Sequence, residues 1–123
     1  MFRDSHAFSG FSTNDLAAAQ DFYGRVLGLE THEEHGILHI DFAGGGRVIV
    51  YPKPDHVPAA FTILDFQVAD IEVAVDALVA AGVTMERYEG LAQDARGIAT
   101  EYPPPIAWFK DPAGNILSVI QED

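Results

Sequence analysis

The chain carries one sequence motif twice. Around Phe11 it reads FSTNDLAAAQDFY, and around Phe66 it reads FQVADIEVAVDAL. Five residues recur 55 positions later, namely Phe11, Asp15, Leu16, Ala19 and Asp21, which match Phe66, Asp70, Ile71, Ala74 and Asp76. Each copy has an apolar strand, an aspartate that caps a helix, and an amphipathic helix that ends at Gly28 or Gly82. A repeat of this length predicts a fold built from two copies of one unit.

Hydrophobic periodicity predicts the elements of each copy. In the first copy we expect strands over 7–12, 29–35, 37–43 and 47–52 and a helix between Asp15 and Gly28. In the second we expect strands over 61–68, from Val83 onward, over 106–110 and over 116–121, with a helix over 70–81. The last two strands form a hairpin whose turn is 111–114, where proline and glycine favour the turn conformation. The fold class is therefore α+β, with two tandem βαβββ modules in a single domain, 1–123. Module one covers about 7–52, a proline-containing linker covers 53–60, and module two covers about 61–121.

Composition excludes several classes of function. The net charge of −12 repels phosphate backbones, so we expect no nucleic-acid partner. The chain has no cysteine, which excludes disulfides and a cysteine nucleophile. No apolar run approaches the roughly 20 residues that cross a bilayer, so we expect no membrane partner. The lack of cysteine fits a cytosolic protein, so we expect a cytoplasmic location.

Two motifs carry a family resemblance that covers about 7–121. They are FSTNDL…FY…LGL in the first half and WFKDPAGNILS in the second. With them the chain resembles the vicinal oxygen chelate superfamily, which includes glyoxalase I, bleomycin-resistance proteins and extradiol dioxygenases. The resemblance implies an eight-stranded, cup-shaped half-barrel with helices outside and a cavity inside. It also implies a homodimer.

Enzymes of this superfamily hold a divalent metal with histidine and carboxylate side chains, one from each of four cavity strands. The resemblance places these ligand positions at Phe8, Val50, Ile63 and Ser118. Apolar side chains cannot bind a metal, and a serine hydroxyl is a weak ligand by itself. The residues on either side of these four positions supply no histidine or carboxylate either. We therefore expect a metal-independent protein with no cofactor.

Strand alternation predicts which side chains line the cavity. The predicted ligand-binding residues are Phe8, His39, Asp41, Val50, Ile63, Asp65, Trp108 and Ser118. An apolar, aromatic pocket with few polar groups suits a partly apolar small molecule. Two alternatives remain open at this stage: His39 and Asp41 facing solvent, and Trp108 packing in the core.

Other patterns are weaker. His32, His35 and His39 recur at helical spacing, but Gly36 and the alternation place them on strands and a turn, so we expect them not to converge. A replacement metal site of His39 with Asp41 and Asp65 is a minor alternative. The segment 90–105 is long enough for a lid over the cup, although disorder accounts for its length equally well.

Three functional hypotheses follow. The first is a binding protein that sequesters a drug or metabolite in the cup. The second is a lyase- or dioxygenase-like enzyme, metal-free or with non-standard ligands, in which His39 acts as the base. The third is an accessory domain with a vestigial cup. The catalytic residues are unknown unless the second hypothesis holds.

Overall fold

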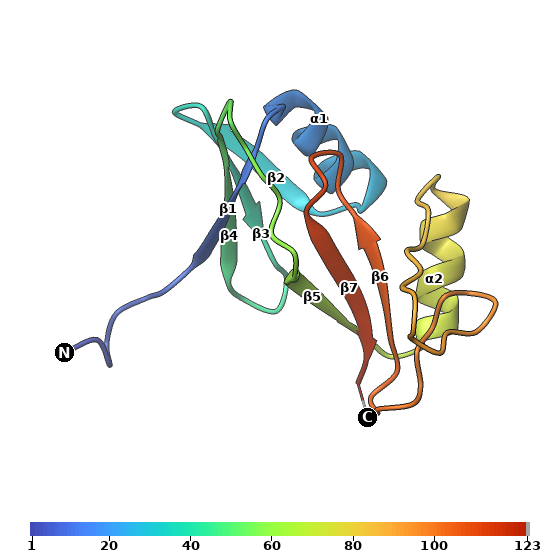
Figure 1. Ribbon diagram of the computed structural model, residues 1–123. Coiled ribbons are helices and arrows are strands. Elements are labelled where there is room, and N and C mark those ends of the chain that lie inside the picture. Colours follow the sequence, from blue (N-terminus) through green and yellow to red (C-terminus); the bar gives the residue numbers. More distant parts are fainter. Residues whose placement is uncertain (123) are drawn as a thin grey trace. The chain divides into compact units, whose positions relative to one another are not determined.

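The computed structural model describes residues 1–122. The chain divides into two compact units, Met1–Val57 and Pro58–Asp123, and the boundary falls within the predicted linker (Figure 1). The described residues form two α-helices, one π-helical stretch and seven strands, and each unit has its own sheet. The predicted α+β class is confirmed.

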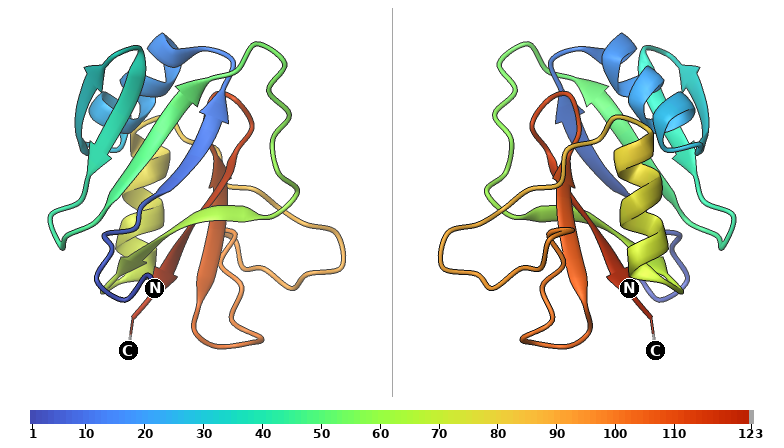
Figure 2. Two further views of the ribbon diagram at one scale, coloured as in Figure 1. Left: turned by 90° about the vertical axis from the view of Figure 1, so that its left-hand side faces the viewer. Right: turned by 90° about the vertical axis from the view of Figure 1, so that its right-hand side faces the viewer.

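Unit 1 has a four-stranded sheet with one helical stretch. Its elements are β1 (Ser9–Thr13), α1 (Leu16–Gln20), the π-helical η1 (Asp21–Val26), β2 (Glu30–Glu34), β3 (Ile37–Asp41) and β4 (Arg47–Pro52). The strand order is β1-β4-β3-β2, with β1 parallel to β4 and the other pairs antiparallel. α1 contacts β3 and β4 on one face of this sheet (Figure 2).

Unit 2 repeats the plan with one strand fewer. Its elements are β5 (Thr62–Val68), α2 (Ile71–Ala80), β6 (Ile106–Lys110) and β7 (Ile116–Gln121). The strand order is β5-β7-β6, with β5 parallel to β7 and β6 antiparallel to it. α2 contacts β7 and β6, and its Ile71 and Val75 are buried.

The predicted eighth strand is reduced to a single point of pairing, so the count is seven strands where we expected eight. Met85 forms an isolated bridge with Phe109, and the Glu86 N–H donates to the Trp108 carbonyl at 2.8 Å. Beyond this point the Tyr88 N–H donates to the Gln93 side-chain oxygen at 2.9 Å instead of to a neighbouring strand. The Gln93 side chain thus takes the place of a backbone acceptor on a neighbouring strand, and the strand pairing ends here.

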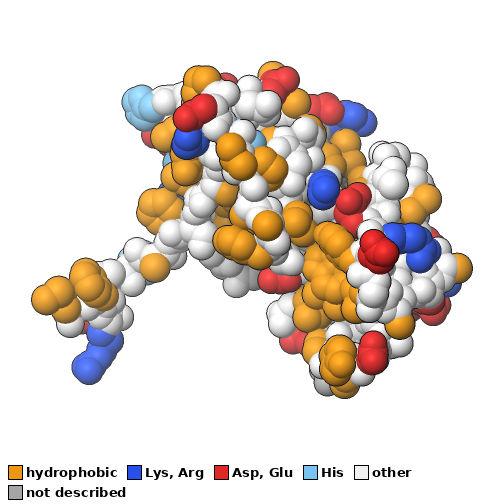
Figure 3. All heavy atoms as spheres, in the orientation of Figure 1, with side chains coloured by type: hydrophobic (Ala, Val, Ile, Leu, Met, Phe, Trp, Pro, Cys, Tyr) orange, Lys and Arg blue, Asp and Glu red, His pale blue; other side chains and the backbone are white. Residues whose placement is uncertain are grey.

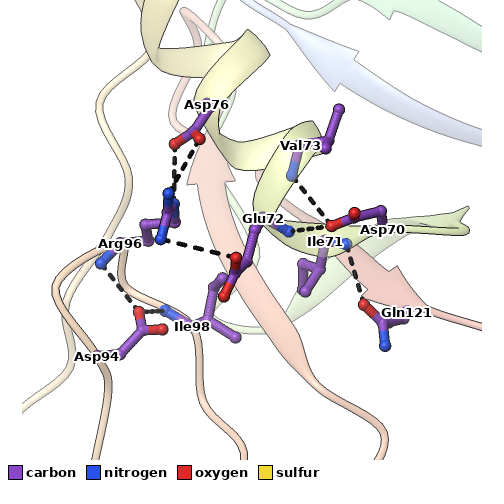
Figure 4. Close-up of polar contacts among 9 residues, drawn as sticks. All are labelled: Asp70, Ile71, Glu72, Val73, Asp76, Asp94, Arg96, Ile98 and Gln121. Atoms are coloured by element: carbon purple, nitrogen blue, oxygen red, sulfur yellow. Dashed lines mark hydrogen bonds and ion pairs between the residues drawn. The ribbon is translucent and has the colours of Figure 1, made fainter.

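Both predicted helix caps are present, and they explain why each helix starts where it does. The Asp15 carboxylate accepts the Ala18 N–H at 3.0 Å. The Asp70 carboxylate accepts the N–H groups of Glu72 and Val73 at 3.1 and 3.3 Å (Figure 4). Each cap therefore satisfies backbone donors that a helix start leaves without partners.

The predicted turn after β6 is also confirmed. Oδ1 of the buried Asp111 accepts the N–H groups of Ala113 and Asn115, both at 2.9 Å. Gly114 has a φ of 85°, a conformation that a residue with a side chain rarely adopts. These contacts set the register of β6 against β7 and so decide which side chains share a face.

The segment between Gly90 and Pro105 has a defined conformation against α2. Arg96 donates to both carboxylate oxygens of Asp76, at 2.9 and 3.1 Å. Its Nη1 also lies 3.9 Å from Oε2 of Glu72 (Figure 4). Oδ1 of Asp94 accepts the N–H groups of Arg96 and Ile98, both at 2.9 Å. Because Ile98 is buried, the segment is anchored by both apolar and polar contacts.

Candidate functional site

Cross-strand pairing shows which side chains of unit 1 share a face. Leu38 lies opposite Val50 and Ile40 opposite Val48, and these four side chains are buried on the helix side. His39 lies opposite Ile49, on the other face. We call this second face, in each unit, the helix-distal face. His39 and Asp41 lie on it as predicted from alternation.

Val50 does not lie on the face of His39. Its Cα partner is Leu38, and its side chain is fully buried in the core of unit 1. Val50 and His39 were expected on one face of the cavity, and this expectation is wrong. The β4 residue that lies opposite His39 on that face is Ile49, one position before Val50. The β4 residues on the helix-distal face are Arg47, Ile49 and Tyr51.

Phe8 and Asp41 are brought together at one pocket. Phe8 precedes β1 and is 60% exposed. The pocket has a volume of about 370 Å³ and is lined by His6, Ala7, Phe8, Asp41, Gly46 and Arg47. Nε of Arg47 donates to Oδ1 of Asp41 at 3.1 Å, so the polar wall of this pocket is an ion pair. The segment before β1 carries further exposed hydrophobic side chains toward the N-terminus (Figure 3).

His32 and His39 do converge, contrary to the sequence-based expectation. They are direct partners in the β2–β3 pair, and their rings stack with centroids 4.8 Å apart and an interplanar angle of 11°. His35 lies in the turn with a φ of 54° and does not join the stack. The short turn at His35 and Gly36 was the available signal, since a tight hairpin pairs residues at equal distances from its centre.

Asp65, Ser118 and Trp108 share the helix-distal face of unit 2. Ser118 is the Cα partner of Asp65 on one side and of Trp108 on the other. The Ser118 hydroxyl donates a hydrogen bond to Oδ1 of Asp65. Ser118 is fully buried, whereas Asp65 is exposed, so the serine orients a carboxylate that solvent can reach.

Ile63 does not take the predicted place beside these residues. The β5–β7 register shifts between Thr62 and Leu64, which displaces Ile63 from the alternation. Thr62 occupies the position instead, and its hydroxyl accepts the Trp108 indole N–H at 3.1 Å. This bond holds the indole ring on the helix-distal face, so Trp108 is not simply a core residue.

Tyr88 is a residue of this face that the sequence did not reveal. Its ring meets Trp108 edge to face, with centroids 5.5 Å apart and planes at 84°. Burial raises the pKa of the Tyr88 phenol above its usual value of 10.0; the Glu86 carboxylate raises it further, and Lys110 opposes the shift. Tyr88 lies beyond the end of the shortened strand, where no periodicity remains to give its direction.

The residues at the positions that the resemblance implies do not fit a metal. Phe8 and Ile63 have no donor atom, Val50 is buried in the core, and the Ser118 hydroxyl is committed to Asp65. The neighbouring side chains Ile49, Tyr51 and Thr62 also lack an imidazole or carboxylate. In unit 2 the carboxylate beside Ser118 is that of Asp65, and in unit 1 His39 and Asp41 lie on β3, away from the four positions. A catalytic metal needs about three protein ligands, and within residues 1–122 these four positions do not supply them.

A sequence model of the Glyoxalase/Bleomycin resistance protein/Dioxygenase superfamily matches residues 6–119. The chain belongs to this superfamily. No curated protein sequence matches it. None of the helices in residues 1–122 has the length and apolar character needed to cross a membrane.

Solved structures of several different bacterial proteins have a similar fold. An integron cassette protein from the mobile metagenome of V. cholerae is 22% identical, with a TM-score of 0.67 over 100% of this chain and 99% of that one. The fosfomycin resistance protein FosX from Listeria monocytogenes is 13% identical, with a TM-score of 0.72 over 98% and 94%. A lactoylglutathione lyase from Agrobacterium tumefaciens is 18% identical, with a TM-score of 0.66 over 97% and 95%. At these identities the likeness establishes the fold alone.

The partly buried phenol of Tyr88 predicts a pH dependence of stability. An unfolded tyrosine titrates near pH 10, and the folded one titrates higher. The stabilisation is therefore fully present below the unfolded pKa and is lost as the pH rises through the folded pKa. We expect Tyr88→Phe to remove this loss, measured by urea unfolding below and above about pH 10. A loss of equal size in wild type and variant would contradict the assignment, and Tyr102→Phe, at an exposed tyrosine, serves as the control.

Proposed function

We propose that the protein binds a partly apolar, aromatic small molecule and sequesters it without turnover. The observation that carries the proposal is the pairing of Trp108 with Tyr88 beside the Asp65–Ser118 hydrogen bond. Aromatic rings supply contact area, and a few oriented polar groups then fix the pose of the ligand. Sequestration requires tight binding at one ligand per site and no catalytic group.

The charge of the face favours one class of ligand. Asp65 is exposed beside the indole ring, and the whole chain has a net charge of −12. A cationic group on an aromatic ligand would be attracted to the carboxylate and to the face of Trp108. We therefore propose an aromatic ligand with an amine or another cationic group.

The single tryptophan of the chain makes this proposal testable. We expect aromatic cationic and glycopeptide antibiotics to change Trp108 fluorescence on titration, with calorimetry giving the stoichiometry. Asp65→Asn should weaken the binding of cationic members more than that of neutral ones, because it removes only the charge. Val73→Ala, at an exposed site on α2, is the matched control. If none of these antibiotics binds at millimolar concentration, the proposal is refuted.

An enzyme with His39 as general base is the second candidate. Nδ1 of His39 is buried and has no hydrogen-bond partner among the described residues, so no neighbouring group competes for this nitrogen. The name of the lactoylglutathione lyase relative suggests lactoylglutathione as the first compound to test. We expect His39→Ala to abolish any turnover and His35→Ala to spare it. A folded His39→Ala variant with full activity would eliminate the mechanism.

Three further proposals concern the whole protein. We propose that the two units act as one domain, that the chain forms a homodimer, and that it works in the cytoplasm. The superfamily resemblance supports the first two, and the absence of cysteine from the sequence is compatible with the third. Sedimentation velocity at micromolar concentration tests the dimer, and a monomer there would refute it.

A further inference from the structure

The β2–β3 hairpin places three potential metal ligands on one face. His32 and His39 are direct cross-strand partners, and Glu34 follows His32 by two residues, so alternation returns its side chain to the same side. Glu33, which lies between His32 and Glu34 in the strand, pairs with Leu38 on the opposite, helix-facing side. The arrangement thus comes from strand register and not from chance contacts of loops.

The donor atoms of these three side chains lie close together. One ring nitrogen of each histidine and one Glu34 oxygen all lie within 4.8 Å of one another. Nε2 of His32 is 3.8 Å from Oε2 of Glu34. Two imidazoles and a carboxylate form the nitrogen-and-oxygen ligand set that zinc and its neighbouring divalent metals accept.

The groups around His32, Glu34 and His39 favour the binding of a cation. Oδ2 of Asp41 lies 3.5 Å from Nδ1 of His32, and Arg47 holds the other oxygen of Asp41 at 3.1 Å. A carboxylate at one ring nitrogen directs the other toward a metal and makes it a better ligand. Nδ1 of His39 is buried and has no hydrogen-bond partner in the described part of the chain.

We propose that His32, Glu34 and His39 bind one divalent transition-metal ion of the zinc type, with Asp41 as the carboxylate that orients His32. The site belongs to β2 and β3, whereas the positions implied by the superfamily resemblance lie on or beside β1, β4, β5 and β7. Three protein ligands leave a fourth position for water or another small ligand. The site does not depend on the small-molecule binding proposed for unit 2.

Binding requires the ligands to close in. Metal–nitrogen bonds of about 2.0–2.1 Å in a tetrahedron bring ligand atoms to about 3.4 Å from one another. The side chains of His32 and Glu34 are 47% and 58% exposed. Both can therefore change rotamer and move their ligand atoms by the roughly 1 Å that is needed. The parallel stack of the two imidazoles must then open, since lone pairs in parallel planes do not meet at one ion.

Titration with Co²⁺, followed by its visible absorption, and competition with Zn²⁺ test the site in the full chain purified without a histidine tag. We expect one ion per chain. Asp41→Asn should weaken binding by about 10–100-fold, and His32→Gln, His39→Gln or Glu34→Gln should weaken it at least as much. The ring resonances of His32 and His39 should shift together in nuclear magnetic resonance spectra on binding.

Two control variants separate this site from adventitious binding. Glu33→Gln removes the same charge from the adjacent position on the opposite face and should bind Co²⁺ as the wild type does. His35→Gln removes an imidazole of the turn that lies 3.8 Å from Oε1 of Glu34 but is not a ligand, so it should weaken binding less than any ligand variant. The proposal is overturned if the wild type binds no ion, or if either control weakens binding as much as the ligand variants. Circular dichroism checks each fold, and the exposed Glu34→Gln carries the test should His39→Gln fail to fold.

Discussion

Strand register is the constraint on which the candidate sites of this protein depend. Each helix covers one face of its sheet, so a side chain is either part of a core or part of the helix-distal face. Leu38, Ile40 and Val50 are fully buried, while His39, between the first two, is only half-buried on the other side. A slip of one residue would exchange these two sets and bury an imidazole under α1. The hydrophobic pattern therefore fixes the positions of the polar groups as well as those of the core.

Most of the fold could be predicted because its signals are local. The capping aspartates, the glycine ends of the helices and the turn at Asp111 each act within a few residues, and all of them lie where the sequence placed them. The eighth strand was predicted from an apolar start at Val83 and was not found beyond Met85. The strand ends there because the Gln93 side chain accepts the Tyr88 N–H, which a neighbouring strand would otherwise bind. Gln93 lies in a loop, where no strand pattern in the sequence indicates this contact.

The sites were harder to predict because they depend on parity across strands. An error of one residue put Val50 on the wrong face, and an irregular register at Thr62 did the same for Ile63. The contact between His32 and His39 depends on the pairing of two strands, which the periodicity of either strand alone does not contain. Within a strand the alternation was sound, so His39, Asp41, Asp65, Trp108 and Ser118 all lie on helix-distal faces.

Comparison of the two units explains how one duplicated backbone acquires two chemistries. His39 and Trp108 are each the central residue of a five-residue strand, β3 or β6, on the helix-distal face. In unit 1 the neighbouring strand β2 is complete, and it sets a second imidazole against His39. In unit 2 the corresponding strand is reduced to one bridge, and Tyr88 turns its ring against Trp108 instead. The core needs apolar side chains only toward the helix, so the opposite face was able to become a histidine–carboxylate cluster in one copy and an aromatic surface in the other.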